Sequence, residues 1–302
     1  MGGGLMFTGE QVPAPFSLGS LLDGWSFEPL VIVPVVVIGL LYLMGYARVR
    51  QQARPVFPAY RAGMFLASLA LAVIAVDGPF DTYSDVDLAT HMGQHLVLLY
   101  LVAPLAVLGA PVTVALRALS AQDRSRFLLP VLHSRTAYVL TRPWVVGILY
   151  AVDLIGTHFT AWYNLSLYHA HVHELEHLSY LVVGILFWGV VLGVEPIHPR
   201  PSPPQRIMLV VLIMPVMVII SLVFILATHP LYPYYPALPA PWGGRAFAMQ
   251  TQAAAGAIMW IPSGLFTLGA VLYIAVHWFR QEEAKQLRLE TLQDEHERSH
   301  TS

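Results

Sequence analysis

Long apolar stretches alternate with short polar ones along the whole chain, and this pattern predicts the fold. A helix needs about 20 apolar residues to cross about 30 Å of hydrocarbon. Seven stretches meet that length, at residues 28–47, 57–76, 88–109, 143–164, 173–194, 206–227 and 246–279. Because hydrocarbon offers the backbone no hydrogen-bond partner, each span is predicted to be a helix. The expected fold is an all-α, polytopic membrane protein, a seven-transmembrane-helix bundle.

Composition supports a lipid environment. Apolar residues make up 56% of the 302 residues and charged residues only 11%, with a mean hydropathy of +0.61. Soluble domains are more charged than this. We expect three parts: an extracytoplasmic N-terminal segment 1–27, a transmembrane domain 28–280 and a cytoplasmic polar tail 281–302. The first segment lacks a basic start and contains Pro13, Pro15 and Asp23, so we expect the first span to direct insertion without a signal peptide.

Basic residues predict the orientation, because loops rich in Lys and Arg stay in the cytoplasm. All but one of the 16 Lys and Arg residues follow spans one, three, five and seven, and the exception is Arg245. This distribution places the N-terminus outside and the C-terminus in the cytoplasm. Topology and lipid headgroups explain these charges, so the expected partner is the lipid bilayer and not a nucleic acid.

Histidines gather at the predicted outer ends of spans three, four and five. His91 and His95 lie four residues apart and would share one face of a helix, and His173 and His177 repeat that spacing. His158 lies near the end of span four, at about the depth of His95. Neutral imidazole binds copper and zinc well. These five histidines are predicted metal ligands, although a lone histidine in a membrane can also simply bond a neighbouring helix.

Several other side chains are candidate accessory groups. Methionine thioethers suit Cu(I), and the chain has no cysteine, so a copper site here would use histidine and methionine. Most methionines of an apolar chain nevertheless fill the core. His169 and His171 are either loop residues or an outer relay for the metal, and Asp153 is either a proton or supporting group or a helix-to-helix hydrogen bond. The accessory candidates are Met92, Asp153, His169, His171 and Met249, with Met259 as a further thioether.

Two other classes of function compete for the same residues. His173-Glu174-Leu175-Glu176-His177 fits H-E-x-x-H, in which two histidines hold zinc and the glutamate activates water. The motif is short, lies in a His-rich tract and has no second signature beside it. An intramembrane zinc metalloprotease is therefore the alternative, with zinc as the alternative metal. A haem-binding membrane protein is a third reading, because histidines on different helices can be axial ligands, but no C-x-x-C-H motif occurs.

Three blocks of the chain resemble the CtaG-type cytochrome c oxidase assembly factors. The first is similar to that family's H-M-x-x-H…A-P…L-G-A-P signature and comprises residues 91–95, 103–104 and 108–111. The second resembles the family's middle block and comprises Thr157, His158, Tyr163, residues 173–177, Phe187 and Trp188. The third, residues 256–262, resembles G-x-I-M-W-x-P. The resemblance covers about residues 30–280.

This resemblance implies a multi-pass protein of the bacterial plasma membrane that helps to build a haem–copper cytochrome c oxidase. It implies a metallochaperone and not an enzyme, with the family's proposed ligands at His91, His95, His158, His173 and His177. Copper, as Cu(I) or Cu(II), would come from an extracytoplasmic donor and pass to an oxidase subunit. One departure from the family pattern is Thr251-Gln252-Ala253, where an acid-Gln-Gln triplet is expected. This departure leaves open which metal binds and how tightly.

Overall fold

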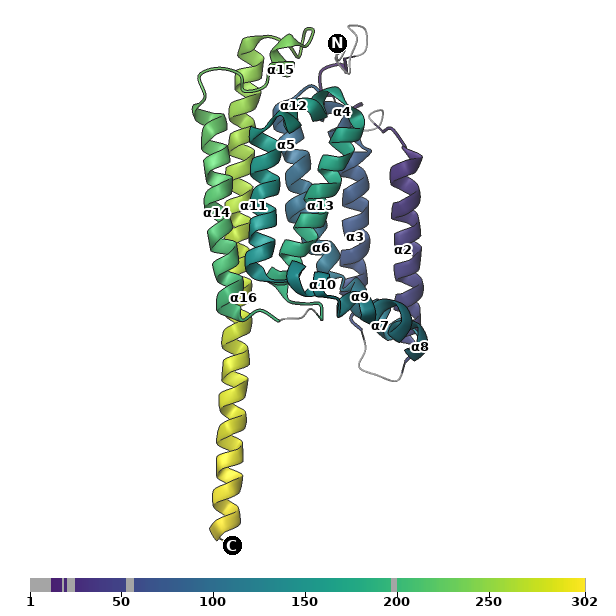
Figure 1. Ribbon diagram of the computed structural model, residues 1–302, viewed down its shortest axis with the longest axis vertical. Coiled ribbons are helices and arrows are strands. Elements are labelled where there is room, and N and C mark those ends of the chain that lie inside the picture. Colours follow the sequence, from purple (N-terminus) through teal and green to yellow (C-terminus); the bar gives the residue numbers. More distant parts are fainter. Residues whose placement is uncertain (1–11, 18, 21–24, 53–56, 197–199, 302) are drawn as a thin grey trace.

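The computed structural model describes residues 12–17, 19–20, 25–52, 57–196 and 200–301, with side chains as far as residue 293. Asp23 and most of the predicted segment 1–27 lie outside the described residues. Helices are the only regular elements in these ranges, and no strand occurs among them (Figure 1). The long helices are α2 (Pro29–Arg50), α3 (Ala59–Val76), α5 (Leu88–Val97), α11 (Pro143–Phe159), α13 (Ala170–Leu192), α14 (Pro203–Leu226) and α16 (Arg245–Thr301). The short elements are α4 (Pro79–Ser84), the π-helix η1 (Leu98–Val102), α6 (Ala103–Leu108), α7 (Pro111–Ala118), α8 (Ala121–Asp123), the π-helix η2 (Arg124–Leu128), α9 (Leu129–Leu132), α10 (Arg135–Leu140), α12 (Ala161–Tyr168) and α15 (Tyr234–Ala237).

The predicted all-α, polytopic membrane fold is confirmed. Six helical segments of the described chain are long and apolar enough to span a bilayer, and a bent helix pair supplies the fourth predicted span. The six segments are Pro29–Arg50, Ala59–Ser84, Leu88–Ala118, Ala170–Leu192, Pro203–Leu226 and Arg245–Gln293. The bent pair consists of α11 and α12. Helix α16 continues without a break through the predicted polar tail, as Figure 1 shows.

The fourth span is bent, where the sequence pattern predicted one helix to residue 164. Helix α11 ends at Phe159 and α12 turns away from it by 67°. Thr160 stands at the break in an extended conformation, with ψ of −179°. Its hydroxyl donates to the carbonyl of Gly156 at 2.6 Å and accepts the N–H of Trp162 at 3.1 Å. One threonine therefore closes the last turn of α11 and caps α12.

The third span contains a π-helical turn, η1. The N–H of Ala103 bonds the carbonyl of Leu98, five residues back, so the next carbonyl in this register, that of Leu99, would pair with residue 104. Residue 104 is a proline, which has no N–H. The indole N–H of Trp188 on α13 donates to the Leu99 carbonyl instead, at 2.7 Å. The wide turn is thus stabilised by a neighbouring helix, one turn beyond His95.

The short helices lie at the two ends of the bundle (Figure 1). At one end, α4, α12 and α15 lie near the start of the chain. At the other end lie α7, α8, α9 and α10, and α16 extends well past them. The connection through these four helices carries the basic residues Arg117, Arg124, Arg126, Arg135 and Arg142. The basic end and the end that carries α4 and α12 are therefore opposite ends of the molecule.

Side chains at the basic end form hydrogen bonds with the free backbone N–H and C=O groups of helix termini, which lipid chains cannot do. The Glu195 carboxylate accepts the N–H groups of Val112 and Thr113 at 2.9 and 3.0 Å, and so caps the start of α7. The Arg206 guanidinium donates to the carbonyls of Val191 and Leu192 at 2.7 and 2.8 Å, at the end of α13. The first contact ties the loop after α13 to α7 and the second ties α14 to α13, so both fix the basic end of the bundle.

A glycine permits the close approach of α14 and α16. A Cβ atom at Gly256 would meet the Ser221 carbonyl oxygen and the Ile225 Cγ1 atom, each at 2.7 Å. No side chain larger than hydrogen fits there without moving the backbone of α14. The first turns of α16 therefore pack closely against the last turns of α14.

Candidate metal centre

Asp87 starts α5 and thereby orients the first histidine pair. Its carboxylate accepts the N–H groups of Ala89 and Thr90, each at 3.2 Å, which is the bonding of a helix N-cap. His91 and His95 follow on one face of the helix, and their ring centroids are 4.5 Å apart. The predicted pairing at four-residue spacing therefore exists in the structure.

Helix α13 brings the second histidine pair to the first. The ring centroids of His173 and His177 are 4.1 Å apart. The His173 ring lies 4.8 Å from that of His91, and the His177 ring lies 5.6 Å from that of His95. Four of the five predicted ligands thus meet between α5 and α13. We call these four side chains the histidine cluster.

The ring nitrogens of the histidine cluster fit a metal ion. Among the described residues, Nε2 of His91, His173 and His177 and both ring nitrogens of His95 are buried without a hydrogen-bond partner. The Nδ1 atom of His91 lies 3.3 Å from the carbonyl oxygen of Ser84, which can only accept, so Nδ1 carries the proton and Nε2 carries the lone pair. Buried polar atoms without partners are costly. A bound cation would satisfy them.

The distances within the histidine cluster suit a single ion. Donor atoms of His91, His95 and His173 all lie within 4.8 Å of one another. Two nitrogens that bind one ion at about 2.0–2.1 Å can be no more than about 4 Å apart. Side-chain movements of about 1 Å or less would therefore bring these three nitrogens to bonding distance.

Asp81 is a site residue that the sequence analysis did not single out. A carboxylate oxygen of Asp81 and donor atoms of His173 and His177 also lie within 4.8 Å of one another. Gln94 holds the carboxylate in place, because its side-chain amide donates to Asp81 Oδ1 at 3.0 Å and to the Ala75 carbonyl at 2.8 Å. The signal was present in the acidic run of residues 77–87, but nothing in that run distinguishes Asp81 from its neighbours.

The turn between α4 and α5 adds a second acidic group to this end. Asp85 lies between the two helices, outside the membrane-spanning segments. Burial and, to a smaller extent, the negative charge of Asp81 together raise the pKa of its carboxyl group to about 7. Protonation of Asp85 near neutral pH therefore limits the negative charge beside the histidine cluster.

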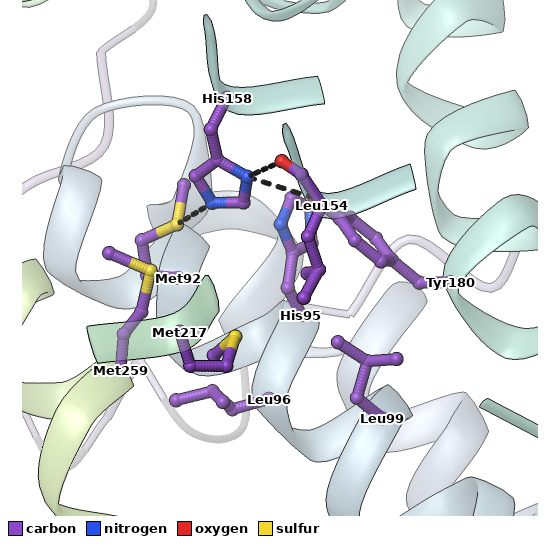
Figure 2. A pocket seen from close by; sticks show the side chains of 9 residues that line it. All are labelled: Met92, His95, Leu96, Leu99, Leu154, His158, Tyr180, Met217 and Met259. Carbon is purple, nitrogen blue, oxygen red and sulfur yellow. Dashed lines mark hydrogen bonds between the residues drawn. The ribbon is translucent and has the colours of Figure 1, made fainter. Parts of the chain in front are cut away.

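His158 does not join the histidine cluster directly. Among the described residues it belongs to neither of the two groups whose donor atoms lie within 4.8 Å. The ring of Tyr163 lies between, with its centroid 5.1 Å from that of His91 and 6.4 Å from that of His158. His158 instead faces Met92, with Nε2 and Sδ 3.3 Å apart, as Figure 2 shows. This ring lines one cavity with Met92 and His95 of α5.

An aromatic layer from the loop before α16 covers this end of the bundle. The Tyr232 hydroxyl donates to the His158 carbonyl at 2.9 Å, and the hydroxyls of Tyr163 and Tyr235 are 3.0 Å apart. The side-chain amide oxygen of Gln252 on α16 accepts the N–H of Leu231 at 2.8 Å, which fixes the loop. Burial raises the pKa of Tyr232 and Tyr235, so both hydroxyls stay protonated, and that of Tyr232 donates to the end of α11.

The remaining accessory candidates lie apart from the histidine cluster. His169 and His171 are exposed at the start of α13, where an outer relay could receive an ion but where their rings contact none of the four cluster rings in the described structure. Asp153 is half-buried on α11. Met249 is half-buried near the start of α16, whereas Met92 lines a small cavity beside His158.

The glutamate of the H-E-x-x-H pattern does not face the histidine cluster. The Glu174 side chain is 64% exposed, and its carboxylate lies 3.5 Å from Nδ1 of His171, which is 93% exposed. A metalloprotease needs this carboxylate beside a metal-bound water. Glu174 is therefore not positioned to act as that general base.

A known family matches most of the chain. The family described as cytochrome c oxidase caa3 assembly factor (Caa3_CtaG) matches residues 40–281. The matched range includes the histidine cluster, Asp81 and His158.

Three mycobacterial proteins are similar to the chain, and each is itself named as uncharacterized. Those of Mycobacterium bovis and Mycobacterium tuberculosis are 29% identical over 211 residues, which is 68% of this chain and 32% of the relative. That of Mycobacterium leprae is 29% identical over 204 residues, 66% of this chain and 31% of the relative. The chain thus spans about a third of the length of these relatives. No solved structure matches the chain.

Proposed function

The chain belongs to the cytochrome c oxidase caa3 assembly factor family, and from that premise we propose that it handles copper while the oxidase is built. It is a multi-pass protein of the bacterial plasma membrane. In this proposal the histidine cluster holds the ion, which comes from an extracytoplasmic donor and passes to an oxidase subunit by ligand exchange. The protein acts as a carrier and not as an enzyme.

One observation carries the proposal. Five ring nitrogens of the histidine cluster are buried between α5 and α13 without a hydrogen-bond partner in the described structure. Neutral imidazole nitrogens of this kind bind copper more strongly than other divalent ions of the first transition row. The exposed Glu174 gives no support to hydrolysis. A copper carrier for oxidase assembly accounts for both the family and the donor set.

We further propose that the histidine cluster faces the outside. The cluster lies at the end that carries α4 and α12, and the arginines of α7, η2 and α10 lie at the opposite end (Figure 1). Because positive charge is retained in the cytoplasm, that opposite end would be cytoplasmic. The ion would then be loaded and released on the outer side of the membrane.

The proposal is tested by the copper content of the purified protein. Mass spectrometry of the detergent-purified chain should find copper, and the double substitution His91→Ala/His95→Ala should remove most of it. The same variant should fail to support oxidase assembly in cells that lack their own copy. His277→Ala is the matched control, because this exposed histidine on α16 belongs to neither the histidine cluster nor the accessory candidates, and it should retain both properties.

Glu174→Gln separates the carrier from the protease. A carrier keeps its copper and its assembly function when this carboxylate is lost, whereas a zinc protease loses only its activity. Copper-free protein together with normal oxidase assembly in the double His91/His95 variant would overturn the proposal.

A further inference from the structure

His158 and a group of methionines lie around a face of α5 that adjoins the histidine cluster. A cavity of about 10 Å³ is lined by Met92, Met217 and Met259, by His158 and by His95. Leu96, Leu99, Leu154 and Tyr180 complete its wall, as Figure 2 shows. A volume near 10 Å³ holds about one water molecule or one ion. The cavity thus has the size and several of the donor atoms of a metal site.

The proton of the His158 ring is committed elsewhere. Its Nδ1 atom lies 2.8 Å from the Leu154 carbonyl oxygen, which can only accept, so Nδ1 is the donor. The Thr157 hydroxyl donates to the Asp153 carbonyl at 2.8 Å and also lies 3.2 Å from the Leu154 carbonyl, whose second lone pair still accepts the His158 N–H. In the neutral ring, Nε2 therefore carries a lone pair and no proton.

That assignment changes the meaning of the contact with Met92. The unprotonated Nε2 of His158 lies 3.3 Å from the Sδ atom of Met92, and both atoms are acceptors. Two lone pairs that point at one another without a proton between them do not form a hydrogen bond. A carbonyl that holds the far nitrogen of a histidine is instead the usual second-layer contact of a metal-binding ring.

Two further thioethers line the same cavity. Met217 on α14 and Met259 on α16 are 3% and 2% exposed, and Figure 2 shows the Met259 sulfur beside the Met92 sulfur, with the Met217 sulfur lower in the view. The close packing of α14 and α16 at Gly256 brings the two helices together near this level. Three sulfurs and one nitrogen form a soft donor set, which selects Cu(I) over zinc and Cu(II).

His95 connects this cavity to the histidine cluster. Its ring lines the cavity and also lies 4.5 Å, centroid to centroid, from the His91 ring. Both of its ring nitrogens are buried without a partner in the described structure. The His95 ring can therefore offer a nitrogen to an ion in the cavity or to an ion in the histidine cluster.

We infer that His158, Met92, Met217 and Met259 form a second, cuprous site next to the histidine cluster, with His95 between the two. This inference rests on the proposal that the ion handled is copper. An ion in the soft site is held as Cu(I) by the thioethers, and it reaches the histidine cluster by exchange of ligands at His95.

The test is a titration of the purified full-length chain with Cu(I) under a reductant, followed by X-ray absorption at the copper edge. The wild-type protein should bind two Cu(I) ions and show both sulfur and nitrogen neighbours. Met92→Leu/Met217→Leu/Met259→Leu should bind one ion, with the sulfur scattering gone. Leucine keeps nearly the same volume as methionine, so the core should still pack.

The matched control replaces three methionines that face away from the core. Met44, Met208 and Met214 are 56%, 55% and 39% exposed, so changing all three to leucine should leave two ions and the sulfur scattering intact. A check without any mutation uses selenomethionine-labelled protein, in which a selenium-edge spectrum should show a copper neighbour only after Cu(I) is added.

The outcomes separate this inference from the proposed function. One bound ion with nitrogen neighbours only would overturn the second site and leave the histidine cluster in place. One bound ion with sulfur neighbours, unaffected by His91→Ala/His173→Ala, would retain the second site and overturn the role of the histidine cluster. No bound Cu(I) would overturn both.

Discussion

Backbone carbonyls prepare two histidines for ion binding. The Ser84 carbonyl faces Nδ1 of His91 at 3.3 Å, and the Leu154 carbonyl faces Nδ1 of His158 at 2.8 Å. Each carbonyl fixes one tautomer and leaves Nε2 free to bind. These carbonyls cannot be removed by substitution of a side chain. Substitutions that test the site must therefore change the side chains that would bind the ion or the charged side chains around them.

Asp81 supplies a negative charge next to the second histidine pair. Asp81→Asn keeps an oxygen that can accept from Gln94 but removes the charge that a copper ion would offset. Loss of such a supporting or ligating group costs about 10- to 100-fold in metal affinity. We expect competition titrations with a copper chelator to show a weakening of that order. An affinity equal to that of wild type would show that the carboxylate does not contact the ion.

Asp85 makes stability depend on pH. Its pKa of about 7 lies above the ordinary value of 3.8, so ionisation is disfavoured in the folded protein. Below about pH 4 the carboxyl group is protonated in both the folded and the unfolded protein and does not lower the free energy of unfolding. As the pH rises to about 7, the free energy of unfolding falls, because only the unfolded protein ionises readily. Metal-free protein should have a lower Tm at pH 8 than at pH 5, and Asp85→Asn should reduce that difference. Glu283→Gln, on the exposed part of α16, should leave it unchanged.

The sequence predicts donors within one helix better than donors that meet by packing. The i, i+4 spacing of His91 and His95 is a local property, and both rings lie where it predicts. The side chains that surround His158 depend on where α11 ends and on how α14 and α16 pack. Neither depends on local pattern, so the sequence indicated His158 and the thioethers of Met92 and Met259 but not that they lie together. Met217 has no sequence signal at all, because most methionines of such a chain fill the core.

At the scale of the element, the hydrophobic pattern located the spans but not their interruptions. The bend at Thr160 and the π-turn η1 both lie within continuous apolar sequence, so hydropathy does not mark them. Each depends on one side-chain bond, Thr160 to Gly156 and Trp188 to Leu99. Pro104 was visible in the sequence, and a proline within a helix predicts a kink or a break. It does not predict that the turn before it is a π-helix.

Trp188→Phe should weaken the π-turn. The substitution leaves the buried Leu99 carbonyl without a donor, which costs about 1–3 kcal/mol. We expect a Tm a few degrees below that of wild type in the same detergent. Trp144→Phe is the control, because Trp144 is 62% exposed on α11, and its Tm should match wild type. An unchanged Tm in Trp188→Phe would mean that the turn does not depend on the indole.

At the scale of the whole molecule, the proposed orientation can be read by labelling. The chain has no cysteine, so a single introduced thiol reports its own side of the membrane. On intact cells, a membrane-impermeant maleimide should label His171→Cys at the histidine end. Ser125→Cys, in η2 at the basic end, should react only after the cells are opened. The reverse pattern would place the histidine cluster in the cytoplasm.

The last helix has one further consequence for the whole molecule. Its 57 residues measure about 85 Å at 1.5 Å per residue, against about 30 Å of hydrocarbon. The turns after residue 280 alone reach roughly 30 Å beyond the bundle. A partner that bound those turns would therefore lie at the opposite end of the bundle from the histidine cluster. Its effect on a bound ion would be transmitted by a tilt of α16, the helix that also carries Met259.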